Sequence, residues 1–253
     1  MSAPRRTDRL RRLLGDLGTA ATMPRIAVVV SRGGDGEDEL LAAFRHRHPR
    51  YRVVGRKVVG VALLALDEVE DADAYLAGLR YARRRVRRAT RLGYRAALFD
   101  PAARRAEVQA IRTSLPERQG RAMDPEFLDP GAPLPTGAGI EYLGVFRGET
   151  LAAYVQLQYA GDIVGMMDLF GHGEHLGDGI MFMLVAAVVD RAKRTRPQAR
   201  FIYYDMYFGA SDGLRAFKRH AGFQPYYVRW RRVPPTPAAS PEGPAAGRPA
   251  ARA

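Results

Sequence analysis

Two short segments in the second half of the sequence contain the residues best suited to group-transfer chemistry. The first, residues 170–180, reads FGHGEHLGDGI, and the second, residues 212–223, reads DGLRAFKRHAGF. A glycine-rich turn at a helix start exposes backbone N–H groups that can bind an anion. Carboxylates, imidazoles and amines can transfer protons or stabilise charge. We therefore expect these segments to form the reaction centre, with the preceding residues serving as a platform or an acceptor site.

Several kinds of catalysis are excluded or disfavoured. The sequence has no cysteine, which excludes a thiol nucleophile, a thiolate metal site and a disulfide scaffold, and it lacks a nucleophile elbow for serine catalysis. His172 and His175 could reach a metal ion from one loop, but only Glu174 lies nearby, so we expect no metal site. The remaining chemistry is attack of an amine on a thioester or ester, which needs a base and an oxyanion donor.

Asp205 and Glu174 are the candidate bases. Asp205 lies in the aromatic run FIYYDMYF at residues 201–208, where partial desolvation would raise its pKa toward a useful range. A structural hydrogen-bonding role for Asp205 is the alternative. In a strand, Tyr203, Asp205 and Tyr207 would share one face. That face would form the polar floor of an acceptor pocket, or a half-buried sheet face with nothing bound.

A polar loop at residues 114–123, SLPERQGRAM, could bind the acceptor. Its two arginines flank a glutamine and a glycine, an arrangement that suits a carboxylate or a phosphate, and loops on a rigid scaffold often carry specificity. The predicted acceptor-binding residues are therefore Ser114, Arg118, Gln119 and Arg121, together with Tyr203 and Tyr207. The alternative for this loop is a helix C-terminus whose charges face solvent.

Positive charge is concentrated in the first half of the chain. The formal net charge is +13, and residues 1–121 hold 26 basic and 14 acidic residues, a net of +12. Such asymmetry favours a polyanionic partner such as RNA, a nucleotide or a membrane surface, although an arginine-rich composition would also produce it. The expected helix at residues 74–92 carries six of these arginines among residues 83–91. They would form either a solvated face or a surface that binds phosphates.

A mixed series of strands and helices must position these residues. Apolar or alternating runs predict strands, and apolar periodicity bounded by Asp or Gly predicts helices. The expected strands are residues 26–30, 51–56, 57–66, 94–99, 141–146, 151–159, 163–170, 201–208 and 224–232. The expected helices are residues 37–48, 74–92, 101–114, 177–194 and 212–222, and residues 124–139 are expected to form a loop. This order indicates a mixed α/β fold with a largely antiparallel central sheet flanked by helices.

The order of elements in residues 94–232 resembles the GNAT acyltransferase superfamily. There, a Gln/Arg-x-x-Gly-x-Gly/Ala turn presents backbone N–H groups at a helix N-terminus to the pyrophosphate of coenzyme A. The matching positions are Glu174, Gly177 and Gly179, with Asp178 between the glycines. The resemblance implies a GNAT-like fold, acyl-coenzyme A as co-substrate, and Gly177, Asp178 and Gly179 as carrier-binding residues. Both carboxylates would repel phosphate, however, and an ordinary turn into a core helix is the alternative.

The second segment departs from the usual GNAT pattern. GNAT enzymes often carry a tyrosine in the short helix before Gly-Phe, and this sequence has Phe217 there. Its GLxxFK run at residues 213–218 is instead similar to the Fem-type aminoacyl-tRNA-dependent transferases, which are GNAT-fold relatives. That resemblance implies an aminoacyl-tRNA carrier, with Phe217 at the carrier site and Lys218 stabilising the leaving ribose oxygen or the adjacent phosphate. The alternative for Lys218 is a surface charge on an amphipathic helix.

We expect a single GNAT-like domain with a basic N-terminal portion. Residues 1–24 would form a basic extension, residues 25–93 a basic α/β portion, residues 94–232 the acyltransferase domain, and residues 233–253 a disordered Pro/Ala-rich tail. No apolar run is long enough to span a bilayer, and no apolar signal segment follows the basic N-terminus. These features predict a cytoplasmic protein.

The predicted function is transfer of an acyl or aminoacyl group from an activated carrier to an amine. Acyl-coenzyme A is favoured as carrier by the strand–turn–helix layout. Aminoacyl-tRNA is favoured by Glu174, by Phe217 and Lys218, and by the basic first half, which would contact tRNA. The alternative function is non-catalytic binding of RNA or another polyanion on the same fold. The acceptor would be a small molecule or peptide with an anionic group, and the oligomeric state is undefined.

Overall fold

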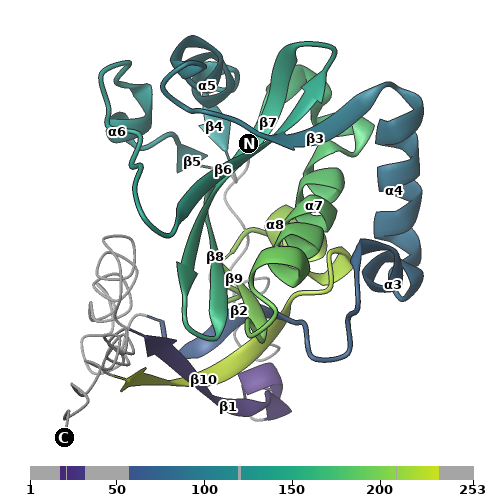
Figure 1. Ribbon diagram of the computed structural model, residues 1–253, viewed down its shortest axis with the longest axis vertical. Coiled ribbons are helices and arrows are strands. Elements are labelled where there is room, and N and C mark those ends of the chain that lie inside the picture. The colour runs from purple at the N-terminus through teal and green to yellow at the C-terminus, as the bar shows by residue number, and fades with distance from the viewer. Residues whose placement is uncertain (1–17, 21, 32–56, 119–120, 209, 234–253) are drawn as a thin grey trace, which may run out of the picture.

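One large mixed sheet organises the molecule. The structure is a computed structural model that describes residues 18–20, 22–31, 57–118, 121–208 and 210–233 (Figure 1). Eight strands form a sheet in the order β1-β10-β2-β9-β8-β7-β6-β3. The β1–β10 and β8–β9 pairs are parallel and the other neighbours are antiparallel. The mixed α/β fold class predicted from the sequence is confirmed.

The strands of this sheet correspond closely to the expected ones. They are β1 Arg25–Ser31, β2 Val59–Ala65, β3 Tyr94–Leu98, β6 Ile140–Arg147, β7 Thr150–Ala160, β8 Ile163–Gly171, β9 Phe201–Met206 and β10 Gln224–Val233. The expected helix at residues 37–48 and strand at residues 51–56 lie outside the described residues. So do most of the predicted N-terminal extension and all of the predicted tail beyond residue 233.

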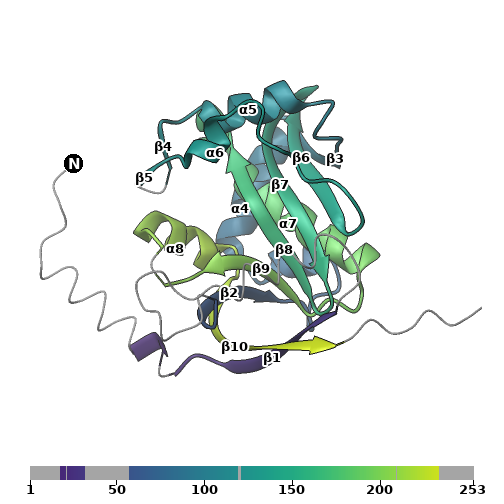
Figure 2. The same ribbon diagram turned by 90° about the vertical axis from the view of Figure 1, so that its left-hand side faces the viewer.

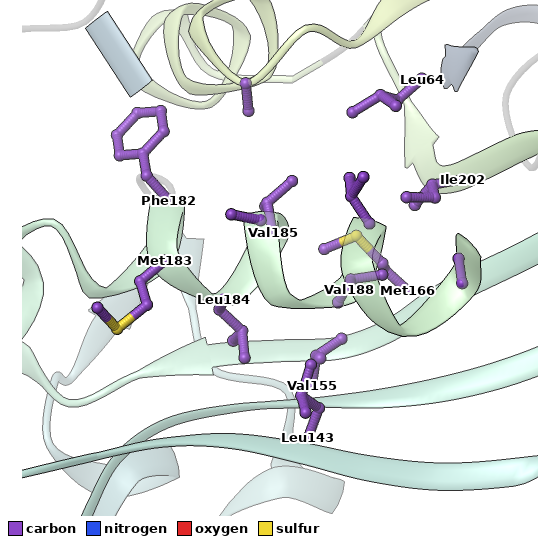
Figure 3. Packing of buried hydrophobic residues seen from close by; sticks show 14 of the residues in the cluster. Leu64, Leu143, Val155, Met166, Phe182, Met183, Leu184, Val185, Val188 and Ile202 are labelled. Carbon is purple, nitrogen blue, oxygen red and sulfur yellow. The ribbon is translucent and has the colours of Figure 1, made fainter. Parts of the chain in front are cut away.

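Helix α7, Ile180–Thr195, forms the centre of the largest core. It is apolar along most of its length, and one face packs on β6 and β7 while α3 and α4 cover another. Figure 3 shows Leu184 pointing from α7 toward Val155 and Leu143 of the sheet. Full burial of each such aliphatic side chain contributes about 1.5–3 kcal/mol. Burial of this helix holds its first turn in place.

Two helices replace the single helix expected at residues 74–92. Helix α3 spans Ala72–Ala77, helix α4 spans Arg80–Arg91, and Gly78 and Leu79 lie between them. Asp71 is the N-cap of α3, since its Oδ1 accepts a hydrogen bond from the Ala74 N–H at 2.8 Å. The uninterrupted helix is wrong because glycine has low helix propensity and Leu79, with non-helical backbone angles, packs its side chain against the core.

Helices cover both faces of the sheet (Figures 1 and 2). Alternation along the strands sends Leu143 and Val155 into the core under α7, and their neighbours Tyr142 and Tyr154 into a second core under α5. Helix α5 spans Arg105–Thr113, followed by a two-stranded ribbon of β4, Glu117–Arg118, and β5, Arg121–Ala122. Helix α6, Pro125–Leu128, lies within the stretch expected to be loop, where Pro125 occupies a first-turn position that suits its missing N–H.

The first part of the chain contributes to the same sheet as the second. Strand β2 lies between β10 and β9, and β1 pairs with the outer edge of β10. Leu64 of β2 and Leu76 of α3 belong to the core cluster built on α7. The predicted division between residues 93 and 94 therefore runs through one continuous sheet. No helix in the described part of the chain is long and apolar enough to cross a membrane.

Candidate functional site

The sheet splits between strands β8 and β9. Their parallel pairing is limited to residues 163–165 of β8 and 201–203 of β9. Beyond it, β8 continues beside β7 while β9 continues beside β2. Figure 2 shows β8 running toward α5 and α6 while β9 runs toward α8. A divergence at the carboxyl ends of parallel strands is a common location for ligand sites.

A cavity of about 280 Å³ occupies this split. Its walls come from the second half of β8, the end of β9, Lys57 two residues before β2, and the segment around β4, β5 and α6. The lining residues are Lys57, Arg118, Ala122, Met123, Asp124, Phe127, Met166, Met167, Asp168, Leu169, Phe170, Tyr203, Tyr204 and Asp205. Apolar and aromatic side chains thus surround a few charged groups, which is the usual composition of a small-molecule site.

Two carboxylates on opposite walls of the cavity have unusual backbone conformations. Asp168 of β8 has φ +34° and Asp205 of β9 has φ +48°, and among the described residues no other non-glycine residue has a positive φ. Such conformations are sparsely populated and concentrate at functional sites. Both residues also coincide with irregular strand register, since β7–β8 and β2–β9 pairing shifts nearby. The backbone irregularities therefore direct two acidic side chains toward the same cavity.

Lys218 lies buried behind the β9 wall. Helix α8 spans Asp212–His220, and Ser211 is its N-cap, because the Ser211 Oγ accepts a hydrogen bond from the Leu214 N–H. Lys218 has no exposed surface; its Nζ donates to the Met206 carbonyl at 2.6 Å and lies 4.5 Å from the Tyr204 ring centre. Burial lowers the pKa of Lys218 to about 8, partly opposed by the nearby Asp205 charge. The interpretation of Lys218 as a surface charge is therefore wrong.

Asp205 is exposed and has cationic and phenolic partners. Lys57 Nζ lies 3.5 Å from Asp205 Oδ1, and the Tyr203 hydroxyl donates to the same oxygen at 3.5 Å. The Asp205 side chain is 64% exposed, so the partial desolvation expected from its aromatic neighbours is wrong. The positive φ at Asp205 accounts for this, because it turns the carboxylate out of the strand's regular pleat.

The shared face expected for residues 203, 205 and 207 does not form. Tyr203 packs with Val61 and Trp230 in a core on one side of the sheet, whereas Tyr207 packs against the core on the α7 side. Strand β9 ends at Met206, and the break at Asp205 cancels the two-residue alternation on which the prediction depended. Tyr203 lines the cavity and Tyr207 does not.

An ion pair between a buried arginine and a partly buried aspartate supports the β8 wall. Arg112 of α5 is 3% exposed; its Nε donates to the Tyr154 hydroxyl at 2.8 Å and an Nη donates to Asp168 at 3.2 Å. Phe127 of α6 lies against the same guanidinium, 5.1 Å from ring centre to Cζ. Sequence reasoning placed Arg112 on a helix but missed this role. The available signal was its spacing, since Val108, Ile111 and Arg112 lie on one helical face.

The polar loop after α5 is held in place by hydrogen bonds that Arg118 donates, mainly to backbone carbonyls. Arg118 lines the cavity, but its terminal nitrogens donate to the carbonyls of Gly171 and Ile111 and to the Ser114 hydroxyl. Burial lowers the pKa of Arg118. Ser114 accepts from the Gly173 N–H at 3.0 Å and does not line the cavity. Arg118 thus closes the C-terminus of α5, as the alternative prediction proposed, although it is half-buried rather than solvent-facing.

For the other two predicted acceptor residues in this loop, Gln119 and Arg121, no described contact indicates a position in the cavity. Gln119 lies outside the described residues. Arg121 pairs with Arg118 through the backbone of the β4–β5 ribbon, and the position of its side chain is not described.

The predicted carrier turn lies away from the cavity and against α4. Residues Gly173–Asp178 form a 3₁₀ helix, η1, and Gly179 follows with φ +96°. A Cβ at Gly179 would lie 2.3 Å from the Arg85 carbonyl oxygen. The Asp178 carboxylate accepts from Arg88 at 3.1 Å and from the Tyr94 hydroxyl at 3.0 Å. The turn therefore packs closely on α4, and the repulsion expected from Asp178 is reduced by its pairing with Arg88.

Glu174 and Phe217 occupy different surroundings from the other site residues. Glu174 is exposed in η1 and does not line the cavity. Phe217 packs between helices and sheet, with ring centres 5.0 Å from Phe182 of α7 and 6.3 Å from Tyr204 of β9. The structure brings Asp205 close to Lys218 and Tyr203, but it does not bring Glu174 to the same place.

Solved structures with similar folds were found, although no protein-family model and no curated protein matches the sequence. FemX is 12% identical over 76% of this chain and 66% of its own, with a TM-score of 0.52. This chain has a GNAT-like fold. The C-terminal domain of a putative lysylphosphatidylglycerol synthetase from Agrobacterium fabrum is 14% identical over 66% of this chain and 58% of its own, with a TM-score of 0.47. A tandem GNAT protein from the clavulanic acid pathway is 15% identical over 88% and 68%, with a TM-score of 0.42.

Proposed function

We propose that this GNAT-like chain transfers an acyl or aminoacyl group from an activated carrier to an amine in the cavity between β8 and β9. The observation that carries the proposal is the buried Lys218 cation, which lies behind a cavity wall formed by Tyr204 and Asp205. Acyl transfer develops negative charge on the carbonyl and leaving oxygens. A fixed cation in a site of low dielectric stabilises such charge far better than one in water.

Each charged group around the β9 end has a role in this proposal. Lys218 supplies a positive field through the Met206 carbonyl and the Tyr204 ring, which its Nζ contacts. Lys57 lines the cavity directly and would contact the leaving group or the oxyanion. Asp205 is exposed at the cavity and would accept a proton from the attacking amine.

Aminoacyl-tRNA is the carrier that the surroundings of the cavity favour over acyl-coenzyme A. The α4 backbone covers Gly179, so a pyrophosphate could not approach the start of α7 from that side. The outer face of α4 lines a surface hollow that suits a phosphate backbone. Its lining residues are Arg80, Tyr81, Arg83, Arg84, Arg87, Thr90 and Arg91.

Turnover assays with two donors would test the proposal. The protein is incubated with an amine acceptor pool and either a charged tRNA pool or acetyl-coenzyme A, and acylated product is detected by mass spectrometry. We expect product from aminoacyl-tRNA. Lys218→Met should lower turnover by about 100-fold or more, the typical effect of removing one preorganised charge-stabilising group. Asp205→Asn should lower turnover by about 100-fold or more as well, the typical effect of removing a general base. Lys193→Met is the control, because Lys193 is partly buried and, like Lys218, donates to a backbone carbonyl, that of Leu66, at 3.3 Å.

Two outcomes would contradict parts of this proposal. Product from acetyl-coenzyme A, with thermal stabilisation by that thioester, would refute the tRNA carrier but not acyl transfer. RNA binding with no acyl product from either donor would favour the second candidate function, non-catalytic binding of a polyanion. The observation that favours this second function is the row of exposed arginines on α4.

A further inference from the structure

Three metal-binding side chains meet at the start of η1, outside the cavity between β8 and β9. His172, Glu174 and His175 each offer a ligand atom, and these atoms lie within 4.8 Å of one another. The Nδ1 atom of His172 is buried and has no hydrogen-bond partner in the described part of the chain. A buried polar atom without a partner is uncommon and needs a physical explanation.

The surrounding hydrogen bonds determine which nitrogen of His175 carries the proton. The Asp178 carboxylate pairs with the Arg88 guanidinium at 3.1 Å, which stabilises its ionised form, and an ionised carboxylate can only accept hydrogen bonds. The Tyr94 hydroxyl must therefore donate to Asp178, at 3.0 Å. That hydroxyl can then only accept from His175 Nδ1, which lies 2.9 Å away.

This proton arrangement prepares His175 to bind a metal ion. With the proton on Nδ1, neutral imidazole presents an unprotonated Nε2. Imidazoles that bind metals almost always donate their other N–H to an outer partner, which fixes the ring and raises its basicity. The Tyr94 hydroxyl is such a partner. It is held in turn by its hydrogen bond to Asp178, which pairs with Arg88.

The backbone also fixes the positions of the three ligands. The His172 N–H donates to the Ala152 carbonyl at 2.8 Å, the Gly173 N–H donates to Ser114 Oγ at 3.0 Å, and the His175 N–H donates to the His172 carbonyl at 3.0 Å. Glu174 is exposed, so its side chain can rotate. Ligands of tetrahedral zinc lie about 3.4 Å apart at bond lengths of about 2.1 Å, and a small movement of Glu174 and the rings would achieve this spacing.

We propose that His172, Glu174 and His175 bind one divalent transition-metal ion of the zinc class. Two imidazoles and one carboxylate are a donor set that suits Zn²⁺ and leaves a fourth position for water or another ligand. The ion would fix the position of η1, which connects the end of β8 to the start of α7. The sequence did not predict a metal site, because a His-x-x-His pair with one carboxylate is a weak pattern. The evidence that the fold adds is the hydrogen bonding of His175 to Tyr94, and of Tyr94 to Asp178, and the fixed backbone of the three ligands.

Zinc titration of the chelator-treated, untagged full-length protein tests this proposal. We expect one Zn²⁺ per chain by calorimetry, a rise in melting temperature on binding, and visible absorption bands when Co²⁺ replaces Zn²⁺. Combined His172→Ala and His175→Ala substitution should abolish specific binding. Tyr94→Phe removes only the outer hydroxyl and should weaken binding by about 10–100-fold.

The matched control is His220→Ala. His220 stacks on Tyr81, with ring centres 4.3 Å apart, and lies outside the cluster, so this variant should bind Zn²⁺ like the unaltered protein. Circular dichroism of each metal-free variant establishes that it is folded. The proposal is overturned if the unaltered protein binds no Zn²⁺ at about 100 μM. It is equally overturned if the double His variant and Tyr94→Phe both bind as tightly as the unaltered protein, since the ion would then occupy another surface.

Discussion

Lys218 is the residue whose burial has the clearest consequence for stability. Its pKa in the folded chain is about 8, below the ordinary value of 10.5, because burial disfavours the charged amine. Between these two values the unfolded chain binds more protons than the folded chain, so the free energy of unfolding rises with pH. The destabilisation is fully present below pH 8 and is relieved as pH approaches 10.5. The 2.5-unit difference corresponds to about 3 kcal/mol.

Urea denaturation of the unaltered protein and of Lys218→Met at pH 7 and pH 10 measures this linkage. The unaltered protein should gain up to about 3 kcal/mol over the variant between the two pH values. Tyrosines titrate in both proteins, so the difference isolates Lys218. Parallel pH profiles for the two proteins would contradict the lowered pKa.

Arg112 illustrates the opposite case, a buried charge that has good partners. Replacing Arg112 by leucine removes the hydrogen bonds that its guanidinium donates to Asp168 and to the Tyr154 hydroxyl. Breaking a buried ion pair typically costs about 3–5 kcal/mol, and we expect the lower end of this range because the Asp168 side chain is 24% exposed. Arg95→Leu is the control, because the Arg95–Glu149 pair at 2.9 Å is exposed on both sides and should contribute less than about 1 kcal/mol. Equal shifts of the urea midpoint would refute the distinction.

The β9 strand shows which part of an element the sequence could predict. Its aromatic and β-branched run predicted the strand, and β9 covers residues 201–206 of the expected 201–208. The facing of its side chains could not be predicted, because the positive φ at Asp205 interrupts the alternation and Tyr207 packs in the core opposite to Tyr203. Aspartate tolerates such backbone angles better than most residues, but it adopts them only where neighbouring strands impose the irregularity.

The junction between α4 and α7 depends on one glycine of the predicted carrier turn. Gly179→Ala would force a Cβ to within 2.3 Å of the Arg85 carbonyl oxygen at a backbone angle of φ +96°. Because backbone on both sides resists movement, we expect a loss of about 2 kcal/mol or more in the free energy of unfolding. Gly177→Ala is the matched control, with no atom within 4 Å of the added Cβ, and should change stability by less than about 1 kcal/mol. Comparable losses in the two variants would show that α4 does not confine the turn.

At the scale of the whole molecule, the sequence could not predict the order of the strands in the sheet. Hairpins such as β6–β7 follow from short connections, and both strands were predicted nearly to their bounds. By contrast, β2 pairs with β9 and β10, which lie far along the chain, and β1 pairs with β10 in parallel. A buried-type strand predicts only that both faces are covered, and it does not identify its neighbours. The residues around the cavity could not be predicted for the same reason. Lys57 precedes β2, and it reaches Asp205 only because β2 pairs with β9.

The position of β2 predicts that residues 94–233 do not fold without the preceding segment. Removing residues 1–93 separates β9 from β10 and removes Leu64, Leu66 and Leu76 from the core around α7. These three side chains alone contribute about 5–9 kcal/mol by burial, as much as the whole net stability of a typical domain. We expect the fragment to lack near-ultraviolet circular dichroism and to unfold without a cooperative transition in urea, whereas the full chain shows both. A cooperative transition with a native-like spectrum would instead mean that the residues from 94 onward form a complete core of their own, and that β1 and β2 only extend it.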